Sequence, residues 1–286
     1  MDSTTPLLSR RSALQLLAAG VAGGALLPQL AAANEAPTRR IDRIGLQLYT
    51  VRAAMTKDLE GTIAAIAAAG ITELEFAGYY NKPPEWWREL MGRHRLTSPA
   101  AHTQLPRTDA DWAPQFATAK AIGQQWVIVP SVGGDYRSLD GFKRLADRLN
   151  SGGALAKAEG LRMGYHNHDF EFAPLEGGTH GLAILLANTD PSLVDFELDL
   201  YWAVKGGQDP LAMIAAHPGR FACCHVKDAG PAPERAMMEV GAGTIDFKTI
   251  LAAGRKAGLK HWFIEHDNPK DALASVAASA AAMKTL

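Results

Sequence analysis

Short apolar segments and longer amphipathic or alanine-rich segments alternate along the chain from residue 44 onward. The short segments are rich in β-branched and aromatic residues and predict strands at residues 44–51, 73–79, 98–103, 126–130, 161–168, 193–201, 221–227 and 262–266. The longer segments predict helices at residues 59–69, 83–94, 111–122, 138–159, 181–187, 210–216, 246–257 and 271–286. Gly70 and Gly123 follow two of these helices as C-caps, and Gly152-Gly153 is a weak point of the longest one.

Eight strand–helix units in one chain predict a (β/α)₈ TIM barrel, which is an α/β fold in a single domain. The chain has 286 residues and is 47% hydrophobic, which is enough for one large core. A doubly wound open sheet is the alternative. It is disfavoured because no Gly-x-Gly-x-x-Gly loop follows the first predicted strand. We therefore expect residues 34–286 to form a TIM barrel.

Residues 1–33 have the features of an export signal. Arg10-Arg11 precedes an apolar run at residues 16–27, and Ala31-Ala32-Ala33 supplies the small residues of a cleavage site. The paired arginines are similar to those of twin-arginine signals. We therefore expect a periplasmic or otherwise exported protein with no membrane contact after cleavage. A retained N-terminal anchor is the alternative.

Charge argues against a nucleic-acid partner. The formal net charge is −1, and lysine and arginine do not cluster on any segment of the sequence. A nucleic-acid-binding face normally carries an excess of positive charge. The two cysteines, Cys223 and Cys224, are neighbours in a predicted strand, where we expect small buried side chains rather than a disulfide.

Titratable and polar residues lie at the C-terminal ends of seven of the eight predicted strands. The working groups of a TIM barrel come from these strand ends and from the loops that follow them. We therefore expect these side chains to form one functional site. In chain order they are Gln47 and Tyr49, Glu73 and Glu75, His102, His166, His168 and Glu171, Glu197 and Asp199, His225, Lys227 and Asp228, and Glu265, His266 and Asp267.

Carboxylate and imidazole groups in this set predict one divalent metal ion as the cofactor, which can be Mn²⁺, Zn²⁺, Co²⁺ or Mg²⁺. Asp199, His225 and Glu265 lie on predicted strands six, seven and eight, so they can face one ion from one arc of the barrel. A fourth ligand would come from the fifth strand.

Five motifs carry a resemblance to a known family. They are GLQLYTVR (residues 45–52), YHNHDFEF (165–172), LDLYW (198–202), HVKD (225–228) and GAGTIDF (241–247). With the predicted barrel, they resemble the sugar phosphate isomerase/epimerase family of the xylose-isomerase-like barrels over residues 41–286. The resemblance implies a metal held by Glu, Asp, His and Glu from strands five to eight.

Three of the implied ligands match Asp199, His225 and Glu265. The first implied ligand, the glutamate of the fifth strand, has no match. Where the family has a Glu-Pro or Glu-Asn pair, this chain has His166-Asn167. Glu171 is the favoured fourth ligand, on the condition that the strand ends before it and the chain turns back. His166 is the substitute.

The resemblance and the expected export together indicate an isomerase or epimerase of an unphosphorylated sugar or keto-sugar. A metal that binds two adjacent oxygens of a polyol acidifies the neighbouring C–H and stabilises an enediolate, and a positioned base moves the proton. The candidate bases are His166, His168 and His102, and Lys227 can polarise the carbonyl. The candidates for binding the carbohydrate are Gln47, Tyr49, Glu75, Trp202 and Glu239.

Three other functions are weighed against this one. A lyase or hydrolase that cleaves 3-keto-glycosides by elimination would use the same proton abstraction. A barrel that binds sugar without catalysis would need only part of the site. A zinc nuclease of the endonuclease IV type is disfavoured, because it needs a histidine three residues after the strand-six aspartate, where this chain has Trp202.

Overall fold

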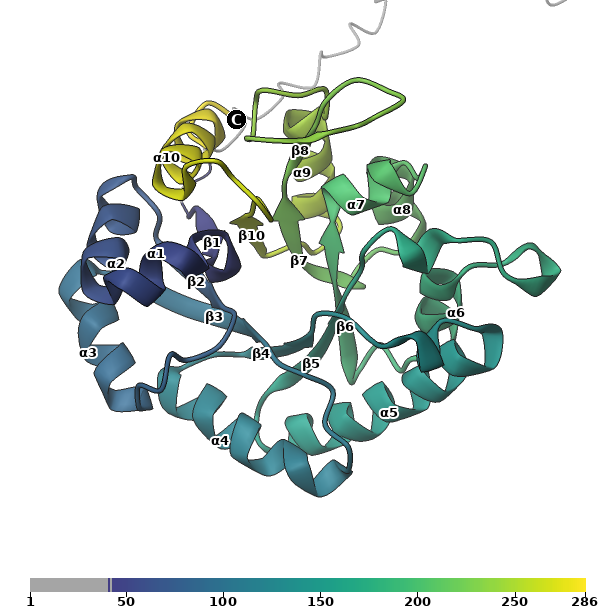
Figure 1. Cartoon of the computed structure of the whole chain (residues 1–286). Coiled ribbons are helices and arrows are strands. Elements are labelled where there is room, and N and C mark those ends of the chain that lie inside the picture. Colours follow the sequence, from purple (N-terminus) through teal and green to yellow (C-terminus); the bar gives the residue numbers. More distant parts are fainter. Residues whose placement is uncertain (1–40, 42) are drawn as a thin grey trace, which may run out of the picture. The chain divides into compact units, whose positions relative to one another are not determined.

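The computed structural model describes residue 41 and residues 43–286, so the expected export signal lies outside the described residues. Eight parallel strands close into a barrel in the order β1-β10-β7-β6-β5-β4-β3-β2 (Figure 1). The predicted (β/α)₈ fold is therefore confirmed. The strands are β1 (Gly45–Gln47), β2 (Glu73–Phe76), β3 (Thr97–His102), β4 (Trp126–Val129), β5 (Arg162–His166), β6 (Val194–Asp199), β7 (Phe221–Val226) and β10 (His261–Ile264).

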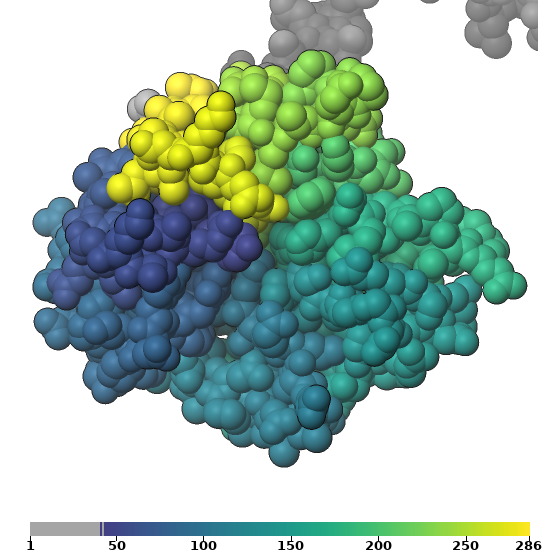
Figure 2. All heavy atoms as spheres, in the orientation of Figure 1, coloured from purple at the N-terminus to yellow at the C-terminus, as the bar shows by residue number. Residues whose placement is uncertain are grey.

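Helices surround the barrel on its outside (Figure 1). In chain order they are α1 (Arg52–Lys57), α2 (Leu59–Ala68), α3 (Pro84–His94), α4 (Ala113–Ile122), α5 (Leu139–Ala158), α6 (Gly181–Asn188), α7 (Leu200–Lys205), α8 (Pro210–Ala216), α9 (Phe247–Lys256) and α10 (Ala272–Met283). Figure 2 shows the yellow C-terminal residues directly against the purple residues at the start of the barrel, where β10 pairs with β1 and closes the ring. Among the described helices, none has the length and apolarity that a membrane crossing requires.

Each barrel strand ends one to four residues earlier than the sequence predicts, and at two of them a polar side chain caps the turn that follows. β1 ends at Gln47, whose side chain accepts a hydrogen bond from the Tyr49 N–H at 3.0 Å and caps a 3₁₀ turn. β6 ends at Asp199, which caps α7 by accepting a hydrogen bond from the Trp202 N–H at 2.8 Å. Local capping therefore fixes two of the candidate site residues at the mouth of the barrel.

Helix α5 continues without a break through Gly152 and Gly153, where the sequence indicated a weak point. A Cβ at Gly152 would lie 2.9 Å from the Trp112 indole nitrogen, and one at Gly153 would lie 2.9 Å from Leu193 Cβ. The two glycines therefore allow the helix to pack closely and do not end it.

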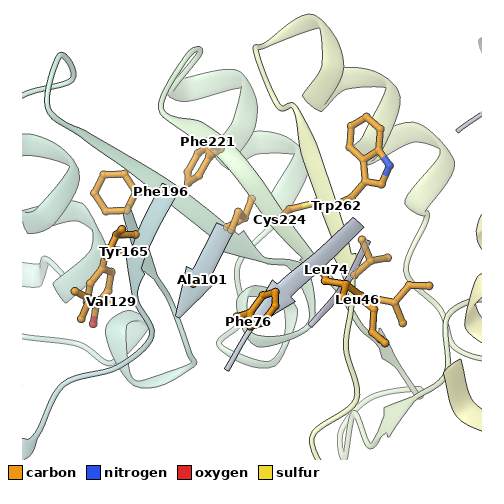
Figure 3. Close-up of a cluster of buried hydrophobic side chains, with 14 of the residues drawn as sticks. Leu46, Leu74, Phe76, Ala101, Val129, Tyr165, Phe196, Phe221, Cys224 and Trp262 are labelled. Carbon is orange, nitrogen blue, oxygen red and sulfur yellow. The ribbon is translucent and has the colours of Figure 1, made fainter. Parts of the chain in front are cut away.

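Two apolar layers support the mouth of the barrel. The larger lies between the strands and the helices, and Figure 3 shows part of it, including Phe76, Tyr165 and Phe196. The smaller fills the interior of the barrel. It consists of Ala100, Trp126, Ile128, Ala222, Cys223 and Phe263. Cys223 precedes His225 by two residues on β7, and Phe263 pairs in register with His225, so this inner layer is the floor beneath the polar residues.

A short hairpin after β7 was not predicted. It pairs β8 (Asp228–Ala229) with β9 (Met237–Met238). A charged acceptor with several donors fixes the backbone around it strongly, so Asp228 anchors this loop beside the site. The buried Asp228 carboxylate accepts hydrogen bonds at 2.8–3.1 Å from four backbone N–H groups, those of Ala229, Gly241, Gly243 and Ile245.

Replacing Asp228 by alanine is expected to lower the free energy of unfolding by about 3 kcal/mol, because four N–H groups lose a charged acceptor. Asp246→Ala is the control. This exposed aspartate caps α9 through the Thr249 N–H, and its loss should cost about 1 kcal/mol. Urea denaturation of both variants measures the two effects. Equal losses would show that Asp228 does not anchor the loop.

Candidate metal centre and active site

The inner side chains at the mouth of the barrel form two levels, because alternate residues of a strand face the same side. Glu197 and Asp199 are two residues apart on β6, and Asp199 pairs in register with His225 on β7. The rings of His166 and His225 lie between the two levels. We call the carboxylates and the lysine nearest the opening the upper group (Asp199, Glu265 and Lys227) and the deeper set the lower group (Glu75, Glu197 and His102).

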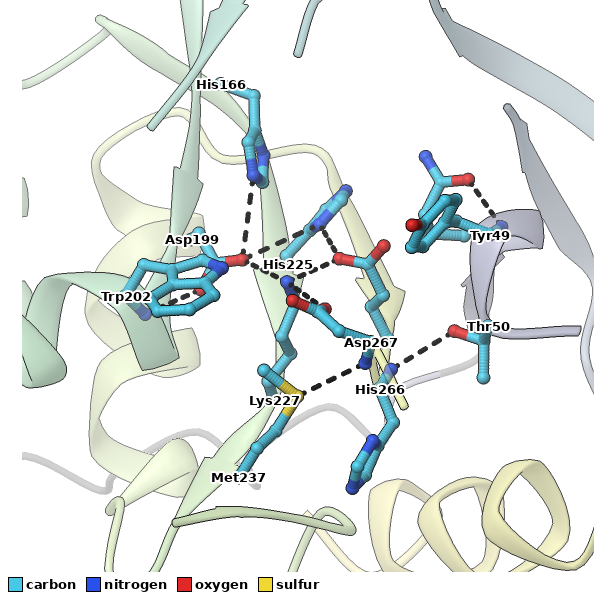
Figure 4. A network of polar contacts seen from close by, with 12 residues as sticks. Tyr49, Thr50, His166, Asp199, Trp202, His225, Lys227, Met237, His266 and Asp267 are labelled. Carbon is cyan, nitrogen blue, oxygen red and sulfur yellow. Dashed lines mark hydrogen bonds and ion pairs between the residues drawn. The ribbon is translucent and has the colours of Figure 1, made fainter. Parts of the chain in front are cut away.

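His225 contacts the upper group through Nδ1. This nitrogen lies 2.8 Å from Glu265 Oε2 and 3.7 Å from Asp199 Oδ2. All three residues are buried, and one ligand atom from each lies within 4.8 Å of the others. Figure 4 shows Asp199 and His225 pointing toward each other from adjacent strands. The structure therefore brings together the three residues that the sequence places on strands six, seven and eight.

Lys227 is buried among carboxylates. Its Nζ lies 2.8 Å from Asp199 Oδ2, 2.5 Å from Glu265 Oε2 and 2.9 Å from Asp267 Oδ1 (Figure 4). Burial alone would lower the pKa of Lys227, but the three carboxylates outweigh it and raise that pKa well above its ordinary value. Burial also raises the pKa of Asp199 to about 6, against the opposing effects of Lys227 and His225. Lys227 is thus a fixed positive charge and not a base.

Glu197, in the lower group, lies where three histidines meet. Its Oε2 is 2.7 Å from His102 Nε2, 3.1 Å from His166 Nδ1 and 3.0 Å from His225 Nε2. Burial alone would raise the pKa of Glu197, but the histidines, His225 foremost, hold it well below its ordinary value. Burial lowers the pKa of His166 well below its ordinary value. From the sequence, Glu197 was expected in the functional site but had no specific role there, although its place two residues before Asp199 on one strand face was a usable signal.

Glu75 is a second buried carboxylate at the same depth. Its Oε2 accepts a hydrogen bond from Gln47 Nε2 at 2.7 Å and lies 2.6 Å from His225 Nε2. Burial and the neighbouring Glu197 raise the pKa of Glu75 to about 7. Gln47 and Glu75, which were expected to bind carbohydrate, therefore lie beneath the histidines and support them.

The donor set fits a divalent cation. Carboxylate oxygens and imidazole nitrogens are ordinary ligands of Zn²⁺, Mn²⁺ and Co²⁺. Glu75 Oε1 and Glu197 Oε1 are buried and have no hydrogen-bond partner among the described residues. Buried oxygens without a partner are costly, and a nearby cation would offset that cost. Asp199, His225 and Glu265 are the residues that would hold a first ion.

Glu171 does not join this centre, contrary to the expectation that it is the fourth ligand. β5 ends at His166, and the chain then turns into a short 3₁₀ helix over Phe170–Phe172. Glu171 Oε1 accepts a hydrogen bond from the Tyr165 hydroxyl at 2.6 Å, and Oε2 accepts one from the His168 N–H at 2.8 Å. Tyr165 and His166 face opposite sides of the strand, so a carboxylate bonded to Tyr165 lies away from the inner ligands. His166 is the fifth-strand residue that faces them.

A cavity of about 730 Å³ opens above the upper group. Tyr49, His102, His166, His168 and Lys227 line it, as the sequence analysis expected of a site built from these residues. The volume is in the range of small-molecule sites. Its wall also contains polar loop residues that the sequence analysis missed, because a loop position carries no periodic signal. They are Thr103, Gln104, Ser131 and Asn268.

Two further candidates for carbohydrate binding lie outside this lining. Trp202 lies next to His168, with ring centroids 5.5 Å apart, and does not itself line the cavity. Glu239 is half-buried in the loop after β9 and is not among the lining residues. Tyr49 is 44% exposed at the opening, with the Arg52 guanidinium 3.9 Å from the centre of its ring. Of the candidates for binding carbohydrate, Tyr49 is therefore the one placed to touch a ligand.

Comparisons with known proteins agree with this fold. A model of the xylose isomerase-like TIM barrel family matches residues 45–286. The inosose dehydratase of Lacticaseibacillus casei is 24% identical over 242 residues, which cover 72% of this chain and 80% of that protein. The inosose dehydratase of Geobacillus thermodenitrificans is 29% identical over 147 residues. That match covers 46% of this chain and 48% of the relative, so it spans about half of the relative's length.

Solved structures share the fold. A sugar phosphate isomerase/epimerase from Parabacteroides distasonis has a TM-score of 0.76 and 26% identity, over 85% of this chain and 93% of that one. The IolI protein, solved with a bound zinc atom, has a TM-score of 0.64 and 13% identity, over 84% of this chain and 96% of that one. The second likeness is one of fold.

Asp199→Asn is expected to lower the affinity for a divalent cation by at least about 100-fold, because it removes a carboxylate from the upper group. Asparagine can still cap α7, so the helix should remain. Calorimetric titration of the metal-free protein with Mn²⁺ or Zn²⁺ measures the loss. Glu239→Gln, outside the cavity, is the control and should bind like the wild type. Unchanged affinity in Asp199→Asn would remove Asp199 from the ligands.

Glu171→Gln is expected to keep the metal affinity and to change the dependence of stability on pH. Burial raises the pKa of Glu171 to about 7, so its stabilising contribution is present at low pH and is lost as the pH rises through 7. Between pH 5 and pH 8 the wild type should lose about 2 kcal/mol of unfolding free energy relative to the variant. Urea denaturation at the two pH values tests this. A loss of metal affinity would instead return Glu171 to the ligand set.

Proposed function

Because the chain belongs to the xylose isomerase-like TIM barrel family, we propose that it is a divalent-metal-dependent isomerase or epimerase of an unphosphorylated sugar or keto-sugar. The observation that carries this proposal is the convergence of Asp199, His225 and Glu265 beneath the cavity of about 730 Å³. An ion held there is close to any polyol that enters, and sugars offer adjacent hydroxyl and carbonyl oxygens.

Asp199, His225 and Glu265 would hold the ion, which when bound polarises the substrate oxygens and acidifies the C–H beside a carbonyl. Lys227 lines the cavity and is fixed by its carboxylate partners. Its ammonium group can therefore stabilise negative charge that develops on a substrate oxygen without rearranging first.

His168 is the base that the geometry favours. It lines the cavity, and its Nδ1 is buried without a hydrogen-bond partner among the described residues. His102 and His166 line the same cavity, but each has a ring nitrogen within 3.1 Å of Glu197. Burial lowers the pKa of His168 to about 3, so the ring is neutral and its Nδ1, which has no partner in the described part of the chain, can act as a proton acceptor.

The cavity supports an unphosphorylated substrate. Lys227 is the only lysine or arginine among its lining residues, and Lys227 Nζ already lies within 2.9 Å of three carboxylates. A phosphate group would need uncommitted arginine, lysine or backbone N–H donors. We also propose that residues 1–33 export the chain, which would agree with a free sugar as the substrate.

A lyase that eliminates a group from a keto-sugar or keto-glycoside is the second candidate. The inosose dehydratases that resemble this chain favour it, because a dehydratase removes water by elimination. Elimination would begin with the same proton removal by His168. It would then need an acid beside the leaving group, and His102 is placed at the cavity wall for that role.

Incubation with aldoses, ketoses and 3-keto-glycosides in D₂O, with Mn²⁺ or Zn²⁺ added, distinguishes the two reactions. Isomerisation or epimerisation should place deuterium beside the carbonyl without loss of a group. Elimination should release water or an aglycone and leave an unsaturated ketone. NMR and mass spectrometry follow both. The absence of exchange and of elimination with every sugar and metal would contradict the proposed function.

His168→Asn is expected to lower kcat by at least about 100-fold on the substrate so found, because it removes the base, while metal content stays the same. His266→Asn is the matched control. His266 also follows a strand at this end of the barrel but does not line the cavity, so its replacement should leave kcat within about twofold. A fall in kcat for His266→Asn that equals the fall for His168→Asn would argue against His168 as the base.

A further inference from the structure

We propose that the mouth of the barrel has a second cation site beneath the first, formed by His102, His166, Glu197 and His225. The two ions would share the His225 imidazole, which would bind one through each ring nitrogen. This inference rests on the proposed function for the first ion and extends it from a one-metal to a two-metal centre.

The first observation is the convergence of four ligand atoms from four strands. His102 comes from β3, His166 from β5, Glu197 from β6 and His225 from β7, and one ligand atom from each lies within 4.8 Å of the others. Three imidazoles and one carboxylate are a common ligand set for a four-coordinate cation. This set is separate from the group of Asp199 and Glu265 in all but His225.

The second observation is that hydrogen bonding alone does not explain why three ring nitrogens crowd around one oxygen of Glu197. Three ring nitrogens lie 2.7–3.1 Å from Glu197 Oε2, although a carboxylate oxygen has only two lone pairs. Oε1 of the same carboxylate is buried and has no hydrogen-bond partner among the described residues. If the histidines only donated hydrogen bonds to Glu197, they would be divided between its two oxygens. Metal ligands that surround one ion would instead bring the three ring nitrogens close to a single carboxylate oxygen, as is seen here.

The third observation concerns the two nitrogens of His225. Nδ1 lies 2.8 Å from Glu265 Oε2 in the upper group, and Nε2 lies 3.0 Å from Glu197 Oε2 in the lower group. The ring therefore separates two sets of ligands and presents one nitrogen to each. An imidazole that has lost both ring protons can bind a cation at each nitrogen, and the loss of those protons is driven by the metal.

The two positions differ in the cations that they favour. The proposed second site, with three ring nitrogens and one carboxylate, suits Zn²⁺ or Co²⁺, which bind such ligands at about 2.0–2.2 Å. Glu197 Oε2 and the three ring nitrogens would need to move apart by only about half an ångström. The upper set has two carboxylates and one nitrogen and also suits Mn²⁺. His102 and His166 line the cavity, so an ion can enter the lower position through the opening.

The test is the number of ions that the protein binds. Metal-free wild-type protein is titrated with Zn²⁺ in a calorimeter, and metal content is measured after removal of free ions. We expect two ions per chain for the wild type and one for Glu197→Gln, which keeps the side-chain volume and removes the charge. Glu73→Gln is the matched control. Glu73 is a buried glutamate on β2 whose carboxylate lies 2.8 Å from His261 Nδ1, outside both groups, and this variant should bind two ions.

One ion per wild-type chain, or a second that binds only at millimolar concentration, would overturn the proposal. If the wild type binds one ion, and Asp199→Asn loses it while Glu197→Gln keeps it, the first site is supported and the second site is refuted. If only Glu197→Gln loses that ion, Asp199, His225 and Glu265 are not the ligands and the proposed function is also contradicted. Anomalous scattering from wild-type crystals grown with Co²⁺ should show two peaks per chain, one at each group. This measurement does not depend on the folding of any variant, and a single peak would refute the second site.

Discussion

Four carboxylates are buried side by side at the mouth of this barrel, and their need for positive charge governs the rest of the site. Glu75, Glu197, Asp199 and Glu265 are all nearly removed from solvent. Buried like charges disfavour ionisation, and a buried charge is tolerated only with a partner. The groups that can supply positive charge have raised pKa values and are Lys227, His102 and His225. These are three groups against four carboxylates, so a cation held among the carboxylates would offset the remaining negative charge.

The apolar layer beneath the four carboxylates increases their need for positive charge. Phe263 pairs with His225, and Cys223 precedes His225 by two residues on the same face of β7, so the side chains directly below the polar groups are apolar. Electrostatic interactions in such surroundings are stronger than at a surface. The floor of the barrel therefore holds the ligands in place and also makes an unbalanced charge among them more costly.

Periodicity was enough to predict the barrel, because eight buried parallel strands and their helices leave a clear alternation in the chain. It also predicted that Asp199 and His225 lie close together, since neighbouring parallel strands end at the same edge of the sheet. It was insufficient for Glu171, whose direction depends on the backbone turn after β5 and not on strand alternation. The β8–β9 hairpin was missed because two-residue strands have no period, and its position depends on the contacts of Asp228 with distant N–H groups.

The stretch from Tyr165 to Glu171 shows how one strand end serves two purposes. Alternation sends His166 inward to Glu197 and Tyr165 outward, where its hydroxyl donates a hydrogen bond to Glu171. The same carboxylate accepts the backbone N–H of His168, which holds that histidine at the cavity wall. Glu171 therefore contributes to the site from outside the inner cluster, by fixing a residue that lines the cavity. A carboxylate close in sequence to candidate metal ligands can thus lie outside their cluster, and the turn that follows the strand decides which of the two positions it takes.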